Sequence, residues 1–276
     1  MKTYKNIAFS LLLLLLSACT GNTPEKNSTS VPHMQTDKSS LFGQPVVEPR
    51  VAYASFNAFW PYYSEYIALN LGFKPLDTAG RVISKGQFLE QLKTGSYGPL
   101  LVYGDGKQPH YRLYPLPVGT DQTIVSYMKQ FGEEFFHFSR LENNPLPDFD
   151  FTTLTGQHYT AANTRGKIIL IKCWFISCKP CREEMPELNR LVDLYKERKD
   201  VIFLSLAIDG KKELQEFLKT TPFYYATVAY KGEYMSRKLF VTEYPTHFIV
   251  NRAGNVVHAL KSVSEVKEAL EKELAK

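Results

Sequence analysis

Apolar and polar residues divide the chain into four stretches of different character. Residues 7–16 are apolar except for Ser10, and residues 20–40 are almost entirely polar. Aromatic side chains then crowd residues 53–73, and from residue 167 onward short apolar runs alternate with amphipathic segments. The pattern predicts an apolar leader, a polar tether and two folded regions.

The apolar leader has the features of an export signal. Lysines precede it, small residues follow it, and the run is shorter than the roughly 20 apolar residues that span a bilayer core. The segment Leu16-Ser17-Ala18-Cys19 resembles the lipobox of bacterial lipoproteins. The resemblance implies that residues 1–18 are a signal peptide that is removed and that Cys19 carries the lipid.

Lipidation at Cys19 implies a location for the protein. A chain of this kind is anchored to a bacterial membrane without spanning it and faces the periplasm. Thr20 stands in place of the aspartate that retains lipoproteins at the inner membrane, which favours the outer membrane. Residues 19–44 are then the lipid anchor and a flexible tether with a reach of about 25 Å, because so polar a segment cannot bury enough surface to order itself.

Residues 45–142 are expected to form a smaller α+β domain of unknown function. Its aromatic residues are interpreted mostly as core, and a surface that docks a substrate or partner is the alternative. The predicted elements are a helix from Pro61 to Leu71, a helix capped by Ser84 and Gln87, strands over residues 100–103 and 111–113, and a helix capped by Asp121.

Residues 143–276 alternate between strand and helix patterns. The predicted strands are residues 167–174, 201–208, 224–230, 246–251 and 255–260, and the predicted helices are residues 185–195, 211–219, 233–240 and 262–274. An alternation that ends in a hairpin and a helix predicts an α/β fold with a mixed central sheet flanked by helices.

The composition and charge narrow the possible functions. With 44% hydrophobic and 22% charged residues, the chain resembles an ordinary folded protein. The net charge is +5, and Lys2 and Lys5 of the leader contribute two of these charges, which leaves +3. So small an excess gives no reason to expect nucleic acid as a partner. Four cysteines are too few for a disulfide-dense scaffold.

Two of the cysteines form the motif Cys178-Lys179-Pro180-Cys181 directly after a predicted strand. The spacing places both sulfurs at the start of one helix, close enough to form a disulfide. The positive end of the helix dipole favours a thiolate at Cys178, and Lys179 adds to this effect. Pro180 fits the first turn, where its missing N–H costs nothing. We therefore expect Cys178 to attack a partner disulfide and Cys181 to resolve the mixed disulfide.

Three other uses of this cysteine pair are alternatives to redox chemistry. A structural zinc site needs about four ligands, and the sequence has no second Cys or His pair with suitable spacing. The other two uses are a permanent structural disulfide and a copper site that includes His247. We expect no metal and no cofactor.

A longer motif carries a family resemblance. The run from Cys173 to Pro186, Cys-Trp-Phe-Ile-Ser-Cys-Lys-Pro-Cys-Arg-Glu-Glu-Met-Pro, is followed much later by Tyr244-Pro245-Thr246. Together they resemble the thioredoxin superfamily, and within it the membrane-tethered extracytoplasmic thiol–disulfide oxidoreductases of the TlpA/ResA type. The resemblance covers about residues 145–276. It implies a thioredoxin-like C-terminal domain that exchanges disulfides with extracytoplasmic proteins.

The same resemblance implies a direction and partners. It favours a reductase. Because the compartment is oxidising, a membrane electron donor would have to recharge the reductase. The partners would be proteins with cysteine pairs or disulfides. A copper-binding or docking lipoprotein that uses the fold without redox turnover is the alternative.

Site residues follow from the family motif by position. Pro245 matches the cis-proline that faces the active-site disulfide, and Tyr244 and Thr246 would pair with the substrate backbone. Glu184 matches an acidic residue near the two sulfurs that takes or gives the proton of the resolving thiol. A solvated surface role, like that of Glu183, is the alternative for Glu184. Lys179 and Pro180, between the cysteines, are expected to contact the substrate.

The chain also departs from related motifs. Ser177 stands where many relatives have tryptophan, which weakens the expectation of an aromatic rim around the nucleophile. Cys173 is expected to be an inert, buried strand residue. Ile171 and Phe175 occupy the positions of the proline and threonine of the peroxiredoxin signature, which argues against peroxidase activity.

Overall fold

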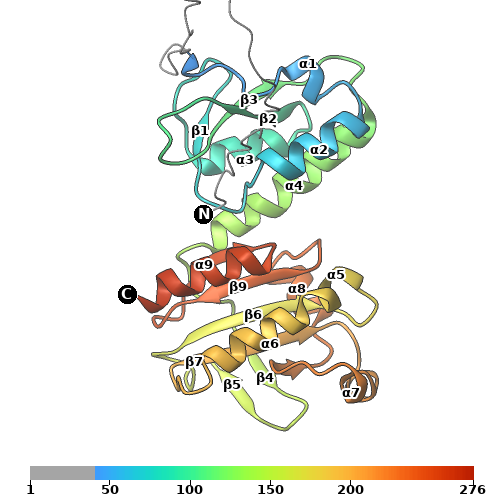
Figure 1. Cartoon of the computed structure of the whole chain (residues 1–276), viewed down its shortest axis with the longest axis vertical. Helices are drawn as coiled ribbons and strands as arrows, with labels where there is room; N and C mark the ends of the chain where they lie inside the picture. The colour runs from blue at the N-terminus through green and yellow to red at the C-terminus, as the bar shows by residue number, and fades with distance from the viewer. Residues whose placement is uncertain (1–40) are drawn as a thin grey trace, which may run out of the picture. The chain divides into compact units, whose positions relative to one another are not determined.

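The computed structural model describes residues 41–276 (Figure 1). The predicted signal peptide, the lipid-bearing Cys19 and most of the tether lie outside these residues. Contacts join residues 41–276 into one unit. Within this part of the chain, no helix combines the length and the apolar character needed to cross a bilayer.

The first part of the described chain is a small α/β region. A three-stranded sheet has the order β1-β3-β2, in which β3 runs parallel to β1 and antiparallel to β2. Its elements are α1 (Pro49–Ala52), α2 (Phe56–Tyr66), β1 (Lys74–Leu76), α3 (Lys85–Lys93), β2 (Tyr97–Val102), β3 (His110–Pro115) and α4 (Gln122–Leu141).

Local signals located most of these elements correctly. Ser84 and Gln87 form the predicted capping box of α3. The side chain of Asp121 accepts a hydrogen bond from the N–H of Thr123 at 2.8 Å and so caps α4. The hairpin of β2 and β3 encloses the predicted Gly-Asp-Gly turn.

The prediction that Pro61 begins a helix is wrong. Helix α2 begins at Phe56, because Ser55 caps it by accepting a hydrogen bond from the N–H of Ala58 at 3.4 Å. Pro61 therefore lies inside the helix, where it removes one backbone donor, and the helix ends at Tyr66, well before Leu71.

The second part of the chain contains a five-stranded mixed sheet of order β10-β9-β6-β7-β8. Strands β6, β7 and β8 are parallel, whereas β9 is antiparallel to both β6 and β10, as predicted for a mixed sheet. Its elements are β6 (Ile168–Trp174), α5 (Lys179–Glu183), α6 (Met185–Leu194), β7 (Val201–Ala207), α7 (Lys211–Thr220), β8 (Ala226–Val228), α8 (Gly232–Arg237), β9 (Thr246–Val250), β10 (Val256–Leu260) and α9 (Val263–Leu274). A separate two-stranded sheet of β4 (Asp150–Thr152) and β5 (His158–Thr160) was not predicted.

Every residue of the central strand β6 is buried, because helices cover both faces of the sheet. Ile168, Leu170 and Trp174 share an apolar cluster with residues of α6 and α9, which lie on the same face of the sheet (Figure 1). The alternate residues of β6 face a second cluster, which includes residues of α8 and of α4.

Helix α4 contributes directly to that second cluster. The ring of Phe138 meets the ring of Phe248 on β9 edge-on, with centroids 5.5 Å apart. The apolar core is thus continuous between residues 45–142 and residues 143–276. The domain boundary near residue 143 stays a prediction.

Candidate active site

The C-x-x-C motif follows β6 and holds a disulfide. Cys178 and Cys181 are bonded, with their Cα atoms 5.3 Å apart. Cys178 is the N-terminal cap of α5, and its sulfur accepts the N–H of Cys181 at 3.2 Å. Cys181 is fully buried, whereas Cys178 is 5% exposed and lies between two exposed residues, Ser177 and Lys179. A partner can therefore approach Cys178 more readily than Cys181.

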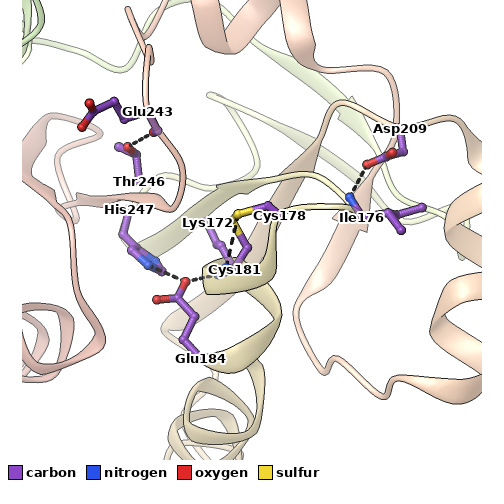
Figure 2. Close-up of a disulfide and its surroundings, with 9 residues drawn as sticks. All are labelled: Lys172, Ile176, Cys178, Cys181, Glu184, Asp209, Glu243, Thr246 and His247. Carbon is purple, nitrogen blue, oxygen red and sulfur yellow. Dashed lines mark hydrogen bonds and ion pairs between the residues drawn. A yellow bond between two sulfur atoms is a disulfide. The ribbon is translucent and has the colours of Figure 1, made fainter.

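The loop that precedes the cysteine motif is hydrogen-bonded to the segment that follows β7. The carboxylate of Asp209, just after β7, accepts a hydrogen bond from the N–H of Ile176 at 2.7 Å (Figure 2). On the other side, the ring of Phe175 meets the ring of Tyr244 edge-on, with centroids 5.3 Å apart. Asp209 was not recognised in the sequence, because it is 33 residues from its partner.

The Tyr244–Pro245 peptide bond is cis, and Thr246 begins β9 directly after it. Thr246 pairs with Cys173 across the sheet, which brings the Tyr244-Pro245 segment to the end of β6 that leads into the cysteine motif. Tyr244 is half-buried, and Thr246 is buried. The structure thus brings the two distant motifs of the sequence to the same edge of the sheet.

Three buried polar side chains meet beneath the disulfide (Figure 2). Lys172 on β6 and His247 on β9 are direct cross-strand partners, and both side chains are fully buried. The ammonium of Lys172 is paired with Oε1 of Glu184, and Nε2 of His247 lies 3.0 Å from the same oxygen. The histidine contact is close without being aligned as a hydrogen bond. We call these three residues the buried triad.

The position of Glu184 depends on a break in the helix. The predicted helix over residues 185–195 is α6, which begins at Met185, and the separate short helix α5 ends at Glu183, with Glu184 between them. Pro186 has no N–H for the carbonyl of Arg182, which favours a break at this point. The side chain of Glu184 is 11% exposed, against 64% for Glu183. Glu184 therefore does not have the solvated surface position that was the alternative.

Burial and charge act against each other in the buried triad. Burial acts to raise the pKa of Glu184, but His247 and Lys172 outweigh it, and the pKa of Glu184 is lowered. Burial lowers the pKa of Lys172 despite the opposing effect of Glu184. Burial also lowers the pKa of His247. At neutral pH Glu184 is therefore a carboxylate.

The sequence motifs do not single out Lys172 as a functional candidate. It lies in a strand that the sequence predicts as a continuous apolar run, and for His247 the sequence suggests only the role of a copper ligand. A signal was present, since a lysine in the middle of a buried strand requires a nearby acidic partner. Glu184 supplies that partner 12 residues later.

The remaining cysteine of the described chain, Cys173, is a buried free thiol. Burial raises the pKa of this thiol to about 12, so it stays protonated at neutral pH. Among residues 41–276 no cluster of three or more His, Cys, Asp or Glu side chains is arranged to hold a metal ion.

We expect Glu184→Gln to lower the free energy of unfolding of the oxidised protein at pH 7 by about 3–5 kcal/mol, because Lys172 is left buried without a counter-charge. Since the folded-state pKa of Glu184 is lowered, its stabilising effect is present above the unfolded pKa of about 4.3 and is lost as the pH falls through the lower folded value. The difference from wild type should therefore shrink at acidic pH.

Urea unfolding at several pH values measures this difference. Glu183→Gln is the matched control, because its ion pair with Lys179 is exposed and should contribute little. Equal effects of the two substitutions at pH 7 would contradict the buried pairing.

The part of the chain that contains this site is similar to known proteins. Residues 143–259 match the AhpC/TSA family. The thiol-disulfide oxidoreductase ResA of Bacillus cereus is 30% identical over 144 residues, which cover 51% of this chain and 83% of that protein. The thioredoxin-like protein YneN of Bacillus subtilis is 27% identical over 135 residues, which cover 48% of this chain and 78% of that protein.

Solved structures also match about half of the chain. A putative thiol:disulfide interchange protein DsbE from Chlorobium tepidum is 25% identical, with a TM-score of 0.43, and the match covers 49% of this chain and 95% of that one. A putative thioredoxin from Neisseria meningitidis is 21% identical, with a TM-score of 0.43 and coverage of 48% and 90%. From the extent of its match to ResA, we conclude that the chain belongs to the AhpC/TSA thioredoxin-like family and is a thiol–disulfide oxidoreductase of the ResA type.

Proposed function

We propose that the protein is a membrane-tethered reductase that acts on the disulfides of extracytoplasmic proteins. The observation that carries this proposal is the asymmetry of the cysteine pair. Cys178 is 5% exposed and lies between two exposed residues, whereas Cys181 is fully buried and is followed one turn later by the ionised Glu184. An asymmetric pair of this kind suits a reaction in which one thiol attacks and the other resolves.

In the proposed reaction the reduced Cys178 thiolate attacks one sulfur of a substrate disulfide. A new S–S bond forms to Cys178, and the other substrate sulfur leaves as a thiolate that takes up a proton. Cys181 then loses its proton and attacks the Cys178 sulfur, which releases the second substrate thiol. Two electrons have passed to the substrate, and Cys178 and Cys181 are left as a disulfide.

Glu184 is proposed to receive the proton of Cys181. It follows Cys181 by one helical turn and is a carboxylate at neutral pH, so it can accept a proton but has none to donate. Lys172 and His247 keep this carboxylate in place. The site thus has a buried proton acceptor for the resolving step.

The loop at Pro245 is proposed to hold the substrate polypeptide beside Cys178. Tyr244 is half-buried and its ring contacts Phe175, so the loop lies beside the segment that leads into the cysteines. Thr246 is buried and pairs with Cys173, so it supports the loop from behind. Lys179 and Pro180 are exposed beside Cys178 and complete the proposed contact surface.

Location and electron supply complete the proposal. The lipobox-like segment supports a lipid anchor at Cys19, and the polar residues 20–40 support a tether. We place the protein on the periplasmic face of a bacterial membrane, with Thr20 favouring the outer membrane. A membrane electron donor would return Cys178 and Cys181 to the dithiol.

Purified protein without residues 1–19 should reduce insulin disulfides in the presence of dithiothreitol. Cys178→Ala should lower the rate to that of dithiothreitol alone, because no attacking thiolate remains. Cys173→Ala is the matched control: it also replaces a cysteine by alanine, but at a buried position outside the motif, and should retain activity. The assay follows insulin turbidity, and an unchanged rate for Cys178→Ala would overturn the proposed role of the pair.

Lipid anchoring is tested separately by cell fractionation. The full chain expressed in a Gram-negative host should be found in the membrane fraction, and Cys19→Ala should move it to the soluble periplasmic fraction because the acyl chains are lost. Cys173→Ala is the control and should stay in the membrane fraction. Membrane association that persists in Cys19→Ala would show that the lipid is not the anchor.

A further inference from the structure

A glutamate of helix α4 is buried against the segment that contains Pro245, which we call the cis-proline loop (residues 240–246). Glu134 is 1% exposed, and its Oε1 lies 2.8 Å from Nζ of Lys261. The same oxygen accepts the N–H of Thr242 at 3.4 Å. A buried carboxylate is costly unless it is paired and hydrogen-bonded, so these contacts hold α4 and the loop at a fixed separation.

Lys261 connects this carboxylate to the residue that follows Pro245. Its Nζ donates to Oγ1 of Thr246 at 3.0 Å as well as to Glu134. The hydroxyl of Thr246 in turn donates to the carbonyl of Glu243 at 2.7 Å (Figure 2). An unbroken series of polar contacts therefore runs from α4 through Lys261 to both sides of Pro245.

Two further residues of α4 touch the same loop. Nε2 of Gln130 donates to the side chain of Glu243 at 3.1 Å. The ring of His137 stacks on the ring of Phe240, with centroids 3.8 Å apart and planes 3° apart. Gln130, Glu134 and His137 are spaced by four and three residues, so they lie on one face of the helix.

The stacked residue Phe240 has an unusual backbone conformation. Its φ is +55°, in the left-handed region that bulky side chains rarely adopt. A conformation of this kind persists only where the surroundings determine it, and the ring of His137 is part of those surroundings. Helix α4 thus contacts the cis-proline loop at its first residue, in its middle and, through Lys261, at its end.

We infer that α4 positions the cis-proline loop for polypeptide substrates, with Glu134 and Lys261 as positioning residues. The inference rests on the proposed function, in which the backbone at Tyr244 pairs with the substrate beside Cys178. A polypeptide disulfide needs the loop in register with the nucleophile, whereas a small disulfide needs only access to the Cys178 sulfur. Residues 45–142 would then contribute to substrate selection through α4.

The test compares Glu134→Gln with Glu90→Gln, both in the full chain purified in detergent. Glu90 is an exposed residue of α3 and undergoes the same chemical change. Initial rates are measured over a range of insulin concentrations with dithiothreitol, and the reduced enzyme is also reacted with the small disulfide dithiodipyridine. Circular dichroism and thermal unfolding confirm that each variant is folded.

We expect Glu134→Gln to raise the KM for insulin by about three- to tenfold, because the loop loses its charged anchor while the reacting sulfurs are untouched. The kcat for insulin and the rate with dithiodipyridine should stay at wild-type values, and Glu90→Gln should match wild type throughout. A KM for Glu134→Gln equal to that of Glu90→Gln would overturn the inference. So would an equal loss with both substrates, since that indicates a general effect on the fold.

Gln130→Ala decides the question if Glu134→Gln fails to fold. Gln130 is exposed, so its truncation does not threaten the core, and only its hydrogen bond to Glu243 is lost. It should raise the KM for insulin by about twofold, because an exposed hydrogen bond contributes less than the ion pair of Glu134 and Lys261. The rate with dithiodipyridine should again stay unchanged. No change in the KM for insulin would overturn the inference. If wild-type protein fails to reduce insulin at all, the proposed function itself is overturned.

Discussion

A positive charge in the middle of the central sheet constrains the whole active-site region. Lys172 is fully buried in β6, and without a counter-charge its burial would cost several kcal/mol. Glu184 supplies that charge, and it can do so only because the helix breaks before Met185 and the side chain of Glu184 faces the sheet. Through Lys172 on β6 and His247 on β9, Glu184 connects both strands to the end of the helix that carries the cysteines. These contacts fix the disulfide relative to the sheet.

A second buried carboxylate has a comparable effect on the other side of the site. Glu134 and Lys261 connect α4 to the strand that begins after Pro245, as Glu184 and Lys172 connect the cysteine helix to β6. The disulfide and the cis-proline loop are thus each held by an ion pair in which one partner is fully buried. Charged contacts of this kind break if either partner moves, whereas apolar contacts tolerate small shifts, so both halves of the site have well-defined positions.

Local patterns predicted most of the C-terminal fold and the reacting pair. Buried strands appear in the sequence as apolar runs, and the C-x-x-C spacing is itself a local feature, so neither required knowledge of tertiary contacts. The error at α2 arose where two local signals competed. Pro61 indicated a helix start, but Ser55 capped the helix earlier.

The supporting residues could not be predicted in this way, because their partners are distant in the sequence. His247 meets Glu184 across 63 positions only after β9 pairs with β6, and Glu134 meets Lys261 across 127. The start of α9 shows the same limit. The hydroxyl of Ser262 accepts the N–H of Glu265, a local contact, but the Glu265 carboxylate accepts the N–H of Lys261 and the side-chain amide of the distant Asn70.

The central claim is that Cys178 attacks the substrate and Cys181 resolves the intermediate. Trapping the intermediate with Cys181→Ala in cells, followed by mass spectrometry of the disulfide-linked adducts, tests it directly. The account predicts extracytoplasmic proteins bound through Cys178, and far fewer adducts with Cys178→Ala. Two results together would contradict it: adducts through Cys181 in the Cys178→Ala variant, and no adducts through Cys178 in the Cys181→Ala variant.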